Sequence, residues 1–317
     1  MGEFELIRQI FLPVAEATAT PAVRLGIGDD CAIQSLPAGT ELVFSVDTLV
    51  EGVHFPRQYE PEHLAWRALA VAASDLAAMG ADPVCFTLAL TLPSSDQAWL
   101  EAFGHGLQAA ARAFDLALAG GDTTRGPLTV TIQVHGTVPD GAAITRGGAR
   151  PADLVCVSGA LGDAGAALGW LDTEPLPPRA SELLARYHRP WPRLGLGKNL
   201  RGLATAAIDI SDGLLADLGH ILTASGVGAT LDVSRVPLSP ALRTLHADRA
   251  ESLALQAGDD YELCFTLPPE HWERVCQLDP GLTVIGRITR ESGLILKRDD
   301  GEERVHATGY DHFGAAQ

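Results

Sequence analysis

Lysine is nearly missing from the sequence: only Lys198 and Lys297 occur among 317 residues. Lysine and arginine together number 23 against 40 acidic residues, so the formal net charge is −17 at pH 7. A field of this sign repels nucleic acid and anionic membranes and favours the binding of cations. We therefore expect neither a nucleic-acid partner nor a membrane partner. Any phosphate group must be recognised by arginine, backbone amides and metal ions.

Cysteine pairs and long apolar runs are also lacking. The five cysteines are scattered without a C-x-x-C pair, so neither a disulfide framework nor a zinc site is indicated. No apolar run approaches the roughly 20 residues that a membrane helix needs. Residues Met1–Glu5 are acidic rather than basic and apolar, so we expect no signal peptide. Together these absences predict a cytoplasmic protein.

Hydrophobic residues, by contrast, are plentiful. They make up 46% of the chain, which predicts a globular protein despite 33 glycines and 20 prolines. The length suits two domains with substantial cores. A stretch rich in glycine, proline and alanine at 139–151 predicts the boundary between a first domain, 1–138, and a second, 139–317. Helix and strand patterns alternate on both sides, so we expect an α/β (or α+β) protein of two domains.

The stretch Ser45–His54 is the first with chemical character. It follows Leu42–Phe44, which is predicted to be a short buried strand, so its polar side chains should lie at the carboxyl end of that strand. Ligands collect at such ends in open α/β folds. Asp47 has hydroxyl residues near it on both sides, and such oxygen ligands suit Mg²⁺ rather than zinc. Alone, this pattern is more typical of caps and turns.

Similar acidic positions recur along the chain. Asp30 follows a glycine pair and belongs either to a turn or to a metal-binding loop. Asp75 lies inside a predicted alanine-rich helix over residues 62–79, where aspartate is unfavourable and a buried unpaired carboxylate is costly. It therefore either faces solvent or is directed into a site.

Two further acidic positions lie near the ends of predicted strands. Asp122 comes after the strand Leu116–Ala119 and two glycines, a pattern that suits either a phosphate and metal loop or a plain β-turn. Asp209 lies on the strand side of a turn that continues to Ser211 and Asp212. Those two residues also fit a helix cap, whereas Asp209 is not needed as one.

The acidic positions are harder to explain together than singly. If they converge, they cannot all stay ionised without cations, because like charges ~4 Å apart repel by about 4 kcal/mol at an effective dielectric near 20. Several Mg²⁺ ions bridging to a polyphosphate would neutralise them, which is the logic of phosphoryl transfer. Glycoside hydrolysis needs only two acids, so the number of acids argues against it. The five positions are Asp30, Asp47, Asp75, Asp122 and Asp209.

Seven segments in order along nearly the whole chain carry a resemblance to a known family. They are Gly26–Cys31, Ser45–Phe55, Ser74–Ala81, Gly120–Pro127, Asp209–Leu214, Asp260–Leu263 and Gly309–Phe313. The sequence resembles the thiamine-monophosphate kinase family, part of the aminoimidazole ribonucleotide synthetase-like superfamily. The resemblance implies ATP-dependent phosphorylation of thiamine monophosphate to thiamine diphosphate. It also implies two α/β domains, with the first domains of two subunits pairing through a shared β-barrel into a homodimer.

The resemblance also assigns residues, motif by motif. The implied Mg²⁺ ligands are Asp30, Ser45, Val46 through its carbonyl, Asp47, Asp75, Asp122, Asp209 and Asp212, of which Asp47, Asp122 and Asp209 are the catalytic centre. The implied ATP contacts are Gly121, Asp122, Arg146 and Ser211, and the implied thiamine-side contacts are His54, Asp260 and Tyr310. The chain departs from the family where Asp259 replaces a common glutamate and where His105 stands in place of a frequent tyrosine.

Two other functions stay open at this point. An ATP-dependent synthetase of purine biosynthesis belongs to the same superfamily, and incubation with thiamine monophosphate or with formylglycinamidine ribonucleotide would separate the two enzymes. A non-catalytic binder of metal ions or thiamine phosphates is the alternative from a different class, and it would release no ADP.

Overall fold

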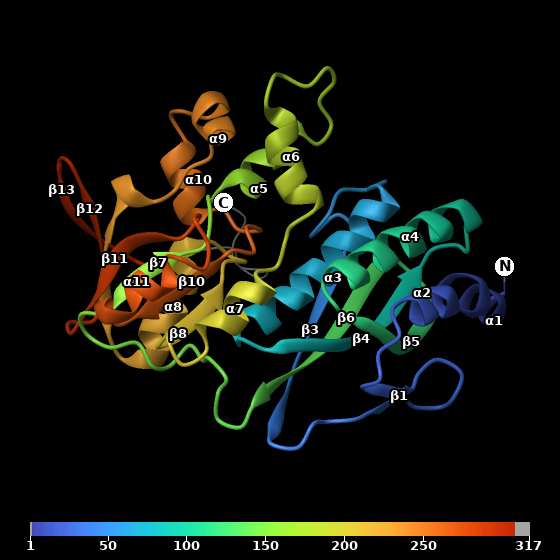
Figure 1. The fold of residues 1–317 in the computed structure, drawn as a ribbon. Coiled ribbons are helices and arrows are strands. Elements are labelled where there is room, and N and C mark those ends of the chain that lie inside the picture. The colour runs from blue at the N-terminus through green and yellow to red at the C-terminus, as the bar shows by residue number, and fades with distance from the viewer. Residues whose placement is uncertain (1, 308–317) are drawn as a thin grey trace. The chain divides into compact units, whose positions relative to one another are not determined.

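The structure, a computed structural model, describes residues 2–307 and divides into two compact units. Unit 1 comprises residues 2–76 and Ala81–Gly141, and unit 2 comprises Ala77–Gly80 and residues 142–307. Each unit has its own β-sheet (Figure 1). The units are described in turn.

Unit 1 is built on a four-stranded sheet in the order β3-β6-β4-β5. Only β4 and β5 run parallel, and α4 connects them; the other neighbours are antiparallel. Helices α3 and α4 lie along one face of this sheet (Figure 1). The strands and helices are β3 (Thr40–Val50), β4 (Asp82–Leu92), β5 (Ala117–Arg125), β6 (Thr129–Pro139), α3 (Pro61–Ala78) and α4 (Gln97–Ala113).

The N-terminal part of unit 1 is helical before it reaches the sheet. Helical structure runs from Glu3 to Ala17, and its middle section, Ile7–Phe11, has π-helical geometry. A small antiparallel pair of strands then precedes β3. These elements are α1 (Glu3–Leu6), η1 (Ile7–Phe11), α2 (Leu12–Ala17), β1 (Val23–Leu25) and β2 (Ile33–Gln34).

Strands β3 and β5 are longer than the sequence predicts. The expectation that the Ser45–His54 stretch begins where its strand ends was wrong, because β3 pairs with β6 residue by residue from Thr40 to Val50. Likewise, the part of the chain that carries Gly121 and Asp122 lies within β5, paired with the last residues of β4. Pairing with a distant strand extends both strands, and local sequence patterns do not contain that information.

Unit 2 contains a seven-stranded sheet in the order β13-β12-β9-β11-β7-β10-β8, antiparallel throughout except for the β12–β9 pair. Its strands are β7 (Leu154–Val157), β8 (Ala206–Asp209), β9 (Gly228–Asp232), β10 (Leu263–Leu267), β11 (Thr283–Thr289), β12 (Gly293–Arg298) and β13 (Gly301–Val305). Its α-helices are α5 (Asp163–Ala167), α6 (Ala180–His188), α7 (Leu194–Leu200), α8 (Leu214–Ser225), α9 (Pro240–Leu245), α10 (Ala250–Gln256) and α11 (Trp272–Val275). Short 3₁₀ turns are η2 (Leu168–Trp170), η3 (Val233–Arg235) and η4 (Pro269–His271).

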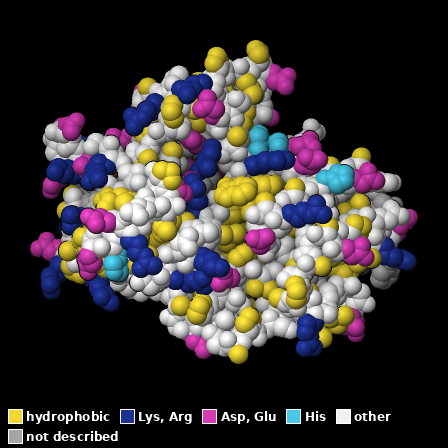
Figure 2. Space-filling view, viewed as in Figure 1, with side chains coloured by type: hydrophobic (Ala, Val, Ile, Leu, Met, Phe, Trp, Pro, Cys, Tyr) yellow, Lys and Arg dark blue, Asp and Glu magenta, His cyan; other side chains and the backbone are white. Residues whose placement is uncertain are grey.

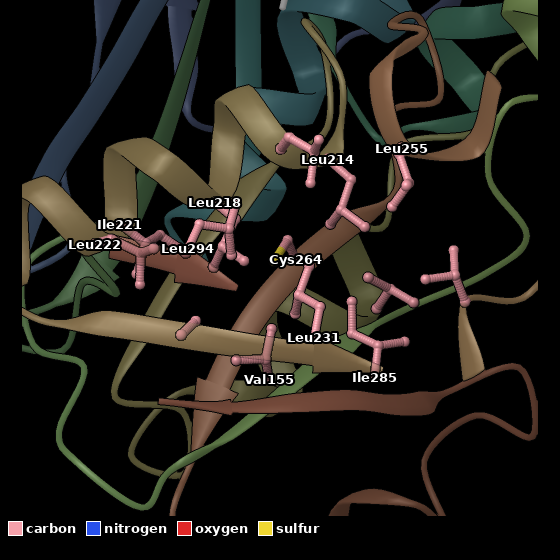
Figure 3. Close-up of a cluster of buried hydrophobic side chains, with 14 of the residues drawn as sticks. Val155, Leu214, Leu218, Ile221, Leu222, Leu231, Leu255, Cys264, Ile285 and Leu294 are labelled. Atoms are coloured by element: carbon pink, nitrogen blue, oxygen red, sulfur yellow. The ribbon is translucent and has the colours of Figure 1, made fainter. Parts of the chain in front are cut away.

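Helix α8 is fixed to the sheet of unit 2 by its apolar face. Leu214, Leu218 and Ile221 belong to a cluster of buried side chains that also contains Val155 and Cys264 of the sheet (Figure 3). Full burial of each leucine or isoleucine contributes about 1.5–3 kcal/mol. The turn that leads from β8 into α8 is therefore attached to a rigid element.

The chain is thus a mixed α/β protein of two domains, and the four-stranded and seven-stranded sheets of the described residues are open rather than closed into a barrel. Within residues 2–307, no helix combines the length and the apolar character needed to span a membrane. Figure 2 shows acidic and basic side chains interspersed over the visible face.

Candidate active site

An acidic pair lies at the helix-covered face of the sheet in unit 1. Ser45 and Asp47 share one face of β3 because side chains alternate along a strand, and the Ser45 hydroxyl donates a hydrogen bond to the Asp75 carboxylate of α3. Burial, and secondly the charge of Asp75, raises the pKa of Asp47 from 3.8 to about 6. Asp75 therefore faces the sheet, not only solvent. The two carboxylates repel each other, and a cation would relieve that repulsion.

Other predicted ligands of unit 1 lie outside this pair. Asp30 is exposed on a turn, and its N–H donates to the side chain of Asp29 at 2.8 Å. Asp122 is exposed on β5, and the Val46 side chain is 60% exposed on the face of β3 opposite to Asp47. Among residues 2–307, no three acidic, histidine or cysteine side chains form a group that could hold a metal ion. In the described part of unit 1, two of the acidic residues predicted to converge, Asp47 and Asp75, therefore lie close together.

Gly121 is needed where β5 approaches β4. Its φ is +157°, and a Cβ atom at this position would lie 1.9 Å from the carbonyl oxygen of Leu88. Any side chain would push the two strands apart. The neighbouring Asp122 is consequently held on a closely paired strand.

His54 lies on the turn that follows β3. The N–H of Val50 donates to His54 Nδ1 at 3.0 Å, so this nitrogen accepts and the ring proton of the neutral form is on Nε2. The ring is half-buried, and this hydrogen bond fixes the tautomer of its neutral form. His105, at the other departure from the family pattern, is exposed on α4.

The turn between β8 and α8 in unit 2 carries three predicted residues. Asp209 is the last residue of β8 and is 5% exposed, and Ser211 and Asp212 are half-buried beyond it. Neither Ser211 nor Asp212 caps α8: its N-cap residue is Gly213, which makes no side-chain cap hydrogen bond. The capping alternative left open by the sequence does not apply.

Sequence reasoning missed Asp217, which is 2% exposed in the first turn of α8. Its Oδ2 atom accepts hydrogen bonds from the N–H groups of Ser211, Asp212 and Gly213 at 3.0, 3.0 and 3.1 Å. Burial raises its pKa to about 7, although these backbone hydrogen bonds act in the opposite direction. The available signal was an aspartate among the apolar residues that define the helix.

Asp260 is buried rather than displayed on a surface. It is 4% exposed, and both of its oxygens accept from the N–H of Gly162, at 3.0 and 2.9 Å. Burial holds its pKa well above the ordinary value, with only partial compensation from the Gly162 N–H. Beside it, the Tyr261 hydroxyl donates to Asp259 at 2.9 Å.

A second group missed by sequence reasoning surrounds Glu262, which is 1% exposed. Arg193 binds both of its carboxylate oxygens, at 2.6 and 2.7 Å, and Arg186 binds one of them. The hydroxyl of Ser158 donates to the same carboxylate at 2.5 Å. Burial alone would raise the pKa of Glu262, but the two arginines outweigh burial and lower it. This carboxylate is ionised and fully compensated.

Arg146 lies exposed on the loop that precedes β7. Its carbonyl accepts from the hydroxyl of Ser225, and that hydroxyl accepts from the N–H groups of Gly148 and Ala149, all three at 3.1 Å. The loop is therefore attached to the last turn of α8. Tyr310, the remaining predicted contact, lies outside the described residues.

Comparison with known protein families identifies the general class to which the two domains belong. Residues 28–138 match the family described as AIR synthase related protein, N-terminal domain, and residues 153–299 match AIR synthase related protein, C-terminal domain. Together with the two open sheets, these matches define an AIR synthase-related protein with both of its domains.

Relatives that match along nearly the whole chain show which family within this class the protein belongs to. Thiamine-monophosphate kinase of Escherichia coli (strain K12) is 46% identical over 321 residues, which cover 98% of each chain. The crystal structure of thiamine-monophosphate kinase from Stenotrophomonas maltophilia K279a has 45% identity and a TM-score of 0.86 over 90% of this chain and 95% of that chain. A structure of AaThiL complexed with AMPPCP and TMP has 32% identity and a TM-score of 0.80 over 99% of both chains. The chain belongs to the thiamine-monophosphate kinase family.

Proposed function

We propose that the protein transfers the terminal phosphoryl group of ATP to the phosphate of thiamine monophosphate, which gives thiamine diphosphate and ADP. The observation that carries this proposal is similarity over 99% of both chains to AaThiL complexed with AMPPCP and TMP. The bond between the bridging oxygen and the terminal phosphorus of ATP breaks. An oxygen of the acceptor phosphate forms the new bond to that phosphorus.

The Asp47–Asp75 pair suits Mg²⁺. Its donors are carboxylate and hydroxyl oxygens, which Mg²⁺ prefers, and the raised pKa of Asp47 reflects a site where a cation would be stabilising. Bound Mg²⁺ supplies neutralisation of the polyphosphate charge and a fixed geometry for transfer. The residues proposed to hold it are Asp30, Ser45, Val46 through its carbonyl, Asp47, Asp75, Asp122, Asp209 and Asp212.

The other contacts follow the same assignment. Gly121, Asp122, Arg146 and Ser211 contact ATP, while His54, Asp260 and Tyr310 contact thiamine monophosphate. Asp260 would act from a buried position, where its carboxyl group contributes to the shape of the thiamine pocket. In this division of roles, residues 1–138 bind ATP and Mg²⁺ and form the dimer, and residues 139–317 complete the active site. The expected cytoplasmic location stays a prediction.

The dimer is proposed to form through β3. This strand lies at the edge of its sheet, and three apolar side chains on it are exposed, Leu42, Phe44 and Val46, at 38%, 61% and 60%. An exposed apolar edge strand favours pairing with another sheet. Two copies of a four-stranded sheet would supply the eight strands of a small barrel. Phe44→Glu should therefore give a monomer by light scattering, whereas Val53→Glu, equally exposed on the following turn, should leave the dimer intact.

A coupled assay of ADP release with thiamine monophosphate, ATP and Mg²⁺ tests the activity. Thiamine diphosphate should form in equal amount to ADP. Activity with formylglycinamidine ribonucleotide instead would favour a purine-pathway synthetase, and binding without ADP release would favour a non-catalytic binder. Mg²⁺ and AMPPCP together should raise the melting temperature far more than either alone, and equal shifts in EDTA would contradict the metal assignment.

A further inference from the structure

The turn between β8 and α8 holds its backbone N–H groups in a concave row. The N–H groups of Ser211, Asp212 and Gly213 all point at one atom, Oδ2 of Asp217, at 3.0–3.1 Å. Successive N–H groups in such a turn form an anion-binding concavity. Here the anion is a side chain of the protein itself.

The carbonyl side of the same turn is held by another segment. The carbonyl of Ser211 accepts from the N–H of Asp259, and the carbonyl of Ile210 accepts from the N–H of Tyr261, both at 2.9 Å. Gly258 permits this approach, because a Cβ atom there would lie 2.1 Å from the Ser211 carbonyl oxygen. The turn is thus attached on both sides, with the carboxylate of Asp217 accepting from three successive N–H groups on one of them.

Asp217 is itself immobile. Its neighbours Leu214 and Leu218 are fully buried in the core of unit 2, on the helix face shown in Figure 3, and the Asp217 N–H continues the first helical turn to the Gly213 carbonyl at 3.0 Å. The carboxylate is 2% exposed, so water does not compete for its hydrogen bonds. Without the Asp217 carboxylate, the three N–H groups of the turn would lose this hydrogen-bond acceptor. The packed helix therefore fixes the position of the turn through Asp217.

We propose that Asp217 is a positioning residue for the active site: its carboxylate holds the β8–α8 turn in the conformation that presents Ser211 and Asp212 to ATP and its metal ions. This inference rests on the proposed function for the identity of the ligand. Asp217 touches neither substrate nor metal ion and acts through the turn.

Amide hydrogen exchange tests the hold on the turn without any ligand. In Asp217→Ala, exchange across residues 211–213 should accelerate by about tenfold or more, because three charge-assisted hydrogen bonds are lost. Asp217→Asn keeps an oxygen acceptor without the charge and should lie between the wild type and the alanine variant. Leu218→Ala is the matched control, since it destabilises the same helix by opening a core cavity but leaves these hydrogen bonds in place.

Kinetics and binding test the consequence for the site. Asp217→Ala should raise KM for ATP and the dissociation constant of Mg²⁺ with AMPPCP by about 10- to 100-fold, and KM for thiamine monophosphate by less than threefold. Asp217→Asn should raise both constants by less than Asp217→Ala does but should remain measurably weaker than the wild type. Leu218→Ala, assayed well below its melting temperature, should change the KM for ATP by less than twofold.

Three outcomes would overturn the proposal: unchanged exchange of the turn in Asp217→Ala, unchanged nucleotide affinity, or an equal loss in Leu218→Ala. If the alanine variant does not fold, Asp217→Asn decides, because wild-type exchange and wild-type nucleotide affinity in that variant would contradict the assignment. Failure of the wild type to phosphorylate thiamine monophosphate would refute the proposed function instead. The exchange experiment keeps its meaning in that case.

Discussion

The two units use the same kind of residue in opposite ways. In unit 1, burial and, secondly, the charge of the nearby Asp75 both raise the pKa of the Asp47 carboxyl group. In unit 2, Glu262 is more deeply buried, yet its pKa is lowered because two arginines surround it. Asp217, also in unit 2, accepts from three backbone N–H groups, but burial outweighs them and raises its pKa to about 7. Burial alone therefore does not identify a functional carboxylate.

Glu262 and Asp47 differ in the source of the positive charge that can compensate the carboxylate. Glu262 has its compensation within the fold, so it stabilises unit 2 and has no need of a ligand. Within the described residues, no lysine or arginine contributes to the shift of the Asp47 pKa, so compensation must come from outside. A carboxylate of that kind is a candidate for cation binding, whereas a compensated one is a candidate for positioning.

The comparison is tested most strongly by removing acidic charges from the proposed metal site. Asp47→Asn and Asp122→Asn should each lower kcat by about 10²–10³-fold or more, because loss of one charge-stabilising group has effects of this size. The fold should stay intact. Asp140→Asn, an exposed aspartate of the same unit, is the control and should keep wild-type turnover. Near-normal turnover in either site variant would show that the metal assignment of that residue is wrong.

Removing the compensated charge should instead affect stability. Glu262→Gln leaves Arg186 and Arg193 without their buried partner and should lower the free energy of unfolding of unit 2 by about 3–5 kcal/mol. Glu303→Gln breaks an exposed ion pair with Arg298 and should change it by at most about 1 kcal/mol. Denaturant titration measures both. Equal effects of the two substitutions would contradict the distinction between buried and exposed pairs.

Local sequence patterns predicted those parts of the fold that depend on local interactions. The helix predicted over residues 62–79 is α3, which spans Pro61–Ala78. The strand predicted to end at Phe44 continues to Val50, since its pairing partner β6 lies far away in the sequence. Propensity reports what a segment favours by itself, and distant pairing overrides it.

The candidate site shows the same division. Motif resemblance assigns roles to Asp47, Asp75 and the Asp209–Asp212 turn, because those positions lie in recognisable segments, and these assignments stay predictions. Asp217 and Glu262 were missed because their roles depend on partners folded against them: backbone donors for Asp217, and Ser158 and two arginines for Glu262. No pattern of spacing contains those contacts.

The pKa of Asp47 gives a prediction for the metal-free protein in EDTA. Its folded-state pKa of about 6 exceeds the unfolded value near 3.8, so the native state binds this proton more tightly. Wild-type stability should therefore fall, relative to Asp47→Asn, as the pH rises from about 4 through 6. The difference should reach about 1–2 kcal/mol at pH 7.5, allowing for partial solvent screening. Thermal unfolding across this pH range measures it.

Asp140→Asn, which replaces an exposed aspartate of the same unit, is measured in parallel as the control. A stability difference between Asp47→Asn and the wild type that stays constant from pH 4 to pH 7.5 would mean that Asp47 titrates as an ordinary surface carboxylate. The contrast between the two units would then rest on geometry alone.

The smallest expected effect concerns the exposed end of α8. Ser225 holds the loop of Arg146 through three hydrogen bonds, but water can replace them, unlike the bonds of Asp217 at the buried end of the same helix. Ser225→Ala should therefore weaken the free energy of ATP binding by about 0.5–1.5 kcal/mol, which corresponds to a rise in KM for ATP of about two- to tenfold. The KM for thiamine monophosphate and kcat should hardly change. Thr223→Ala removes a hydroxyl that bonds within the helix, to the Gly219 carbonyl, and serves as the control. If this control raises the KM for ATP as much as Ser225→Ala does, the effect comes from the helix and not from the Arg146 loop.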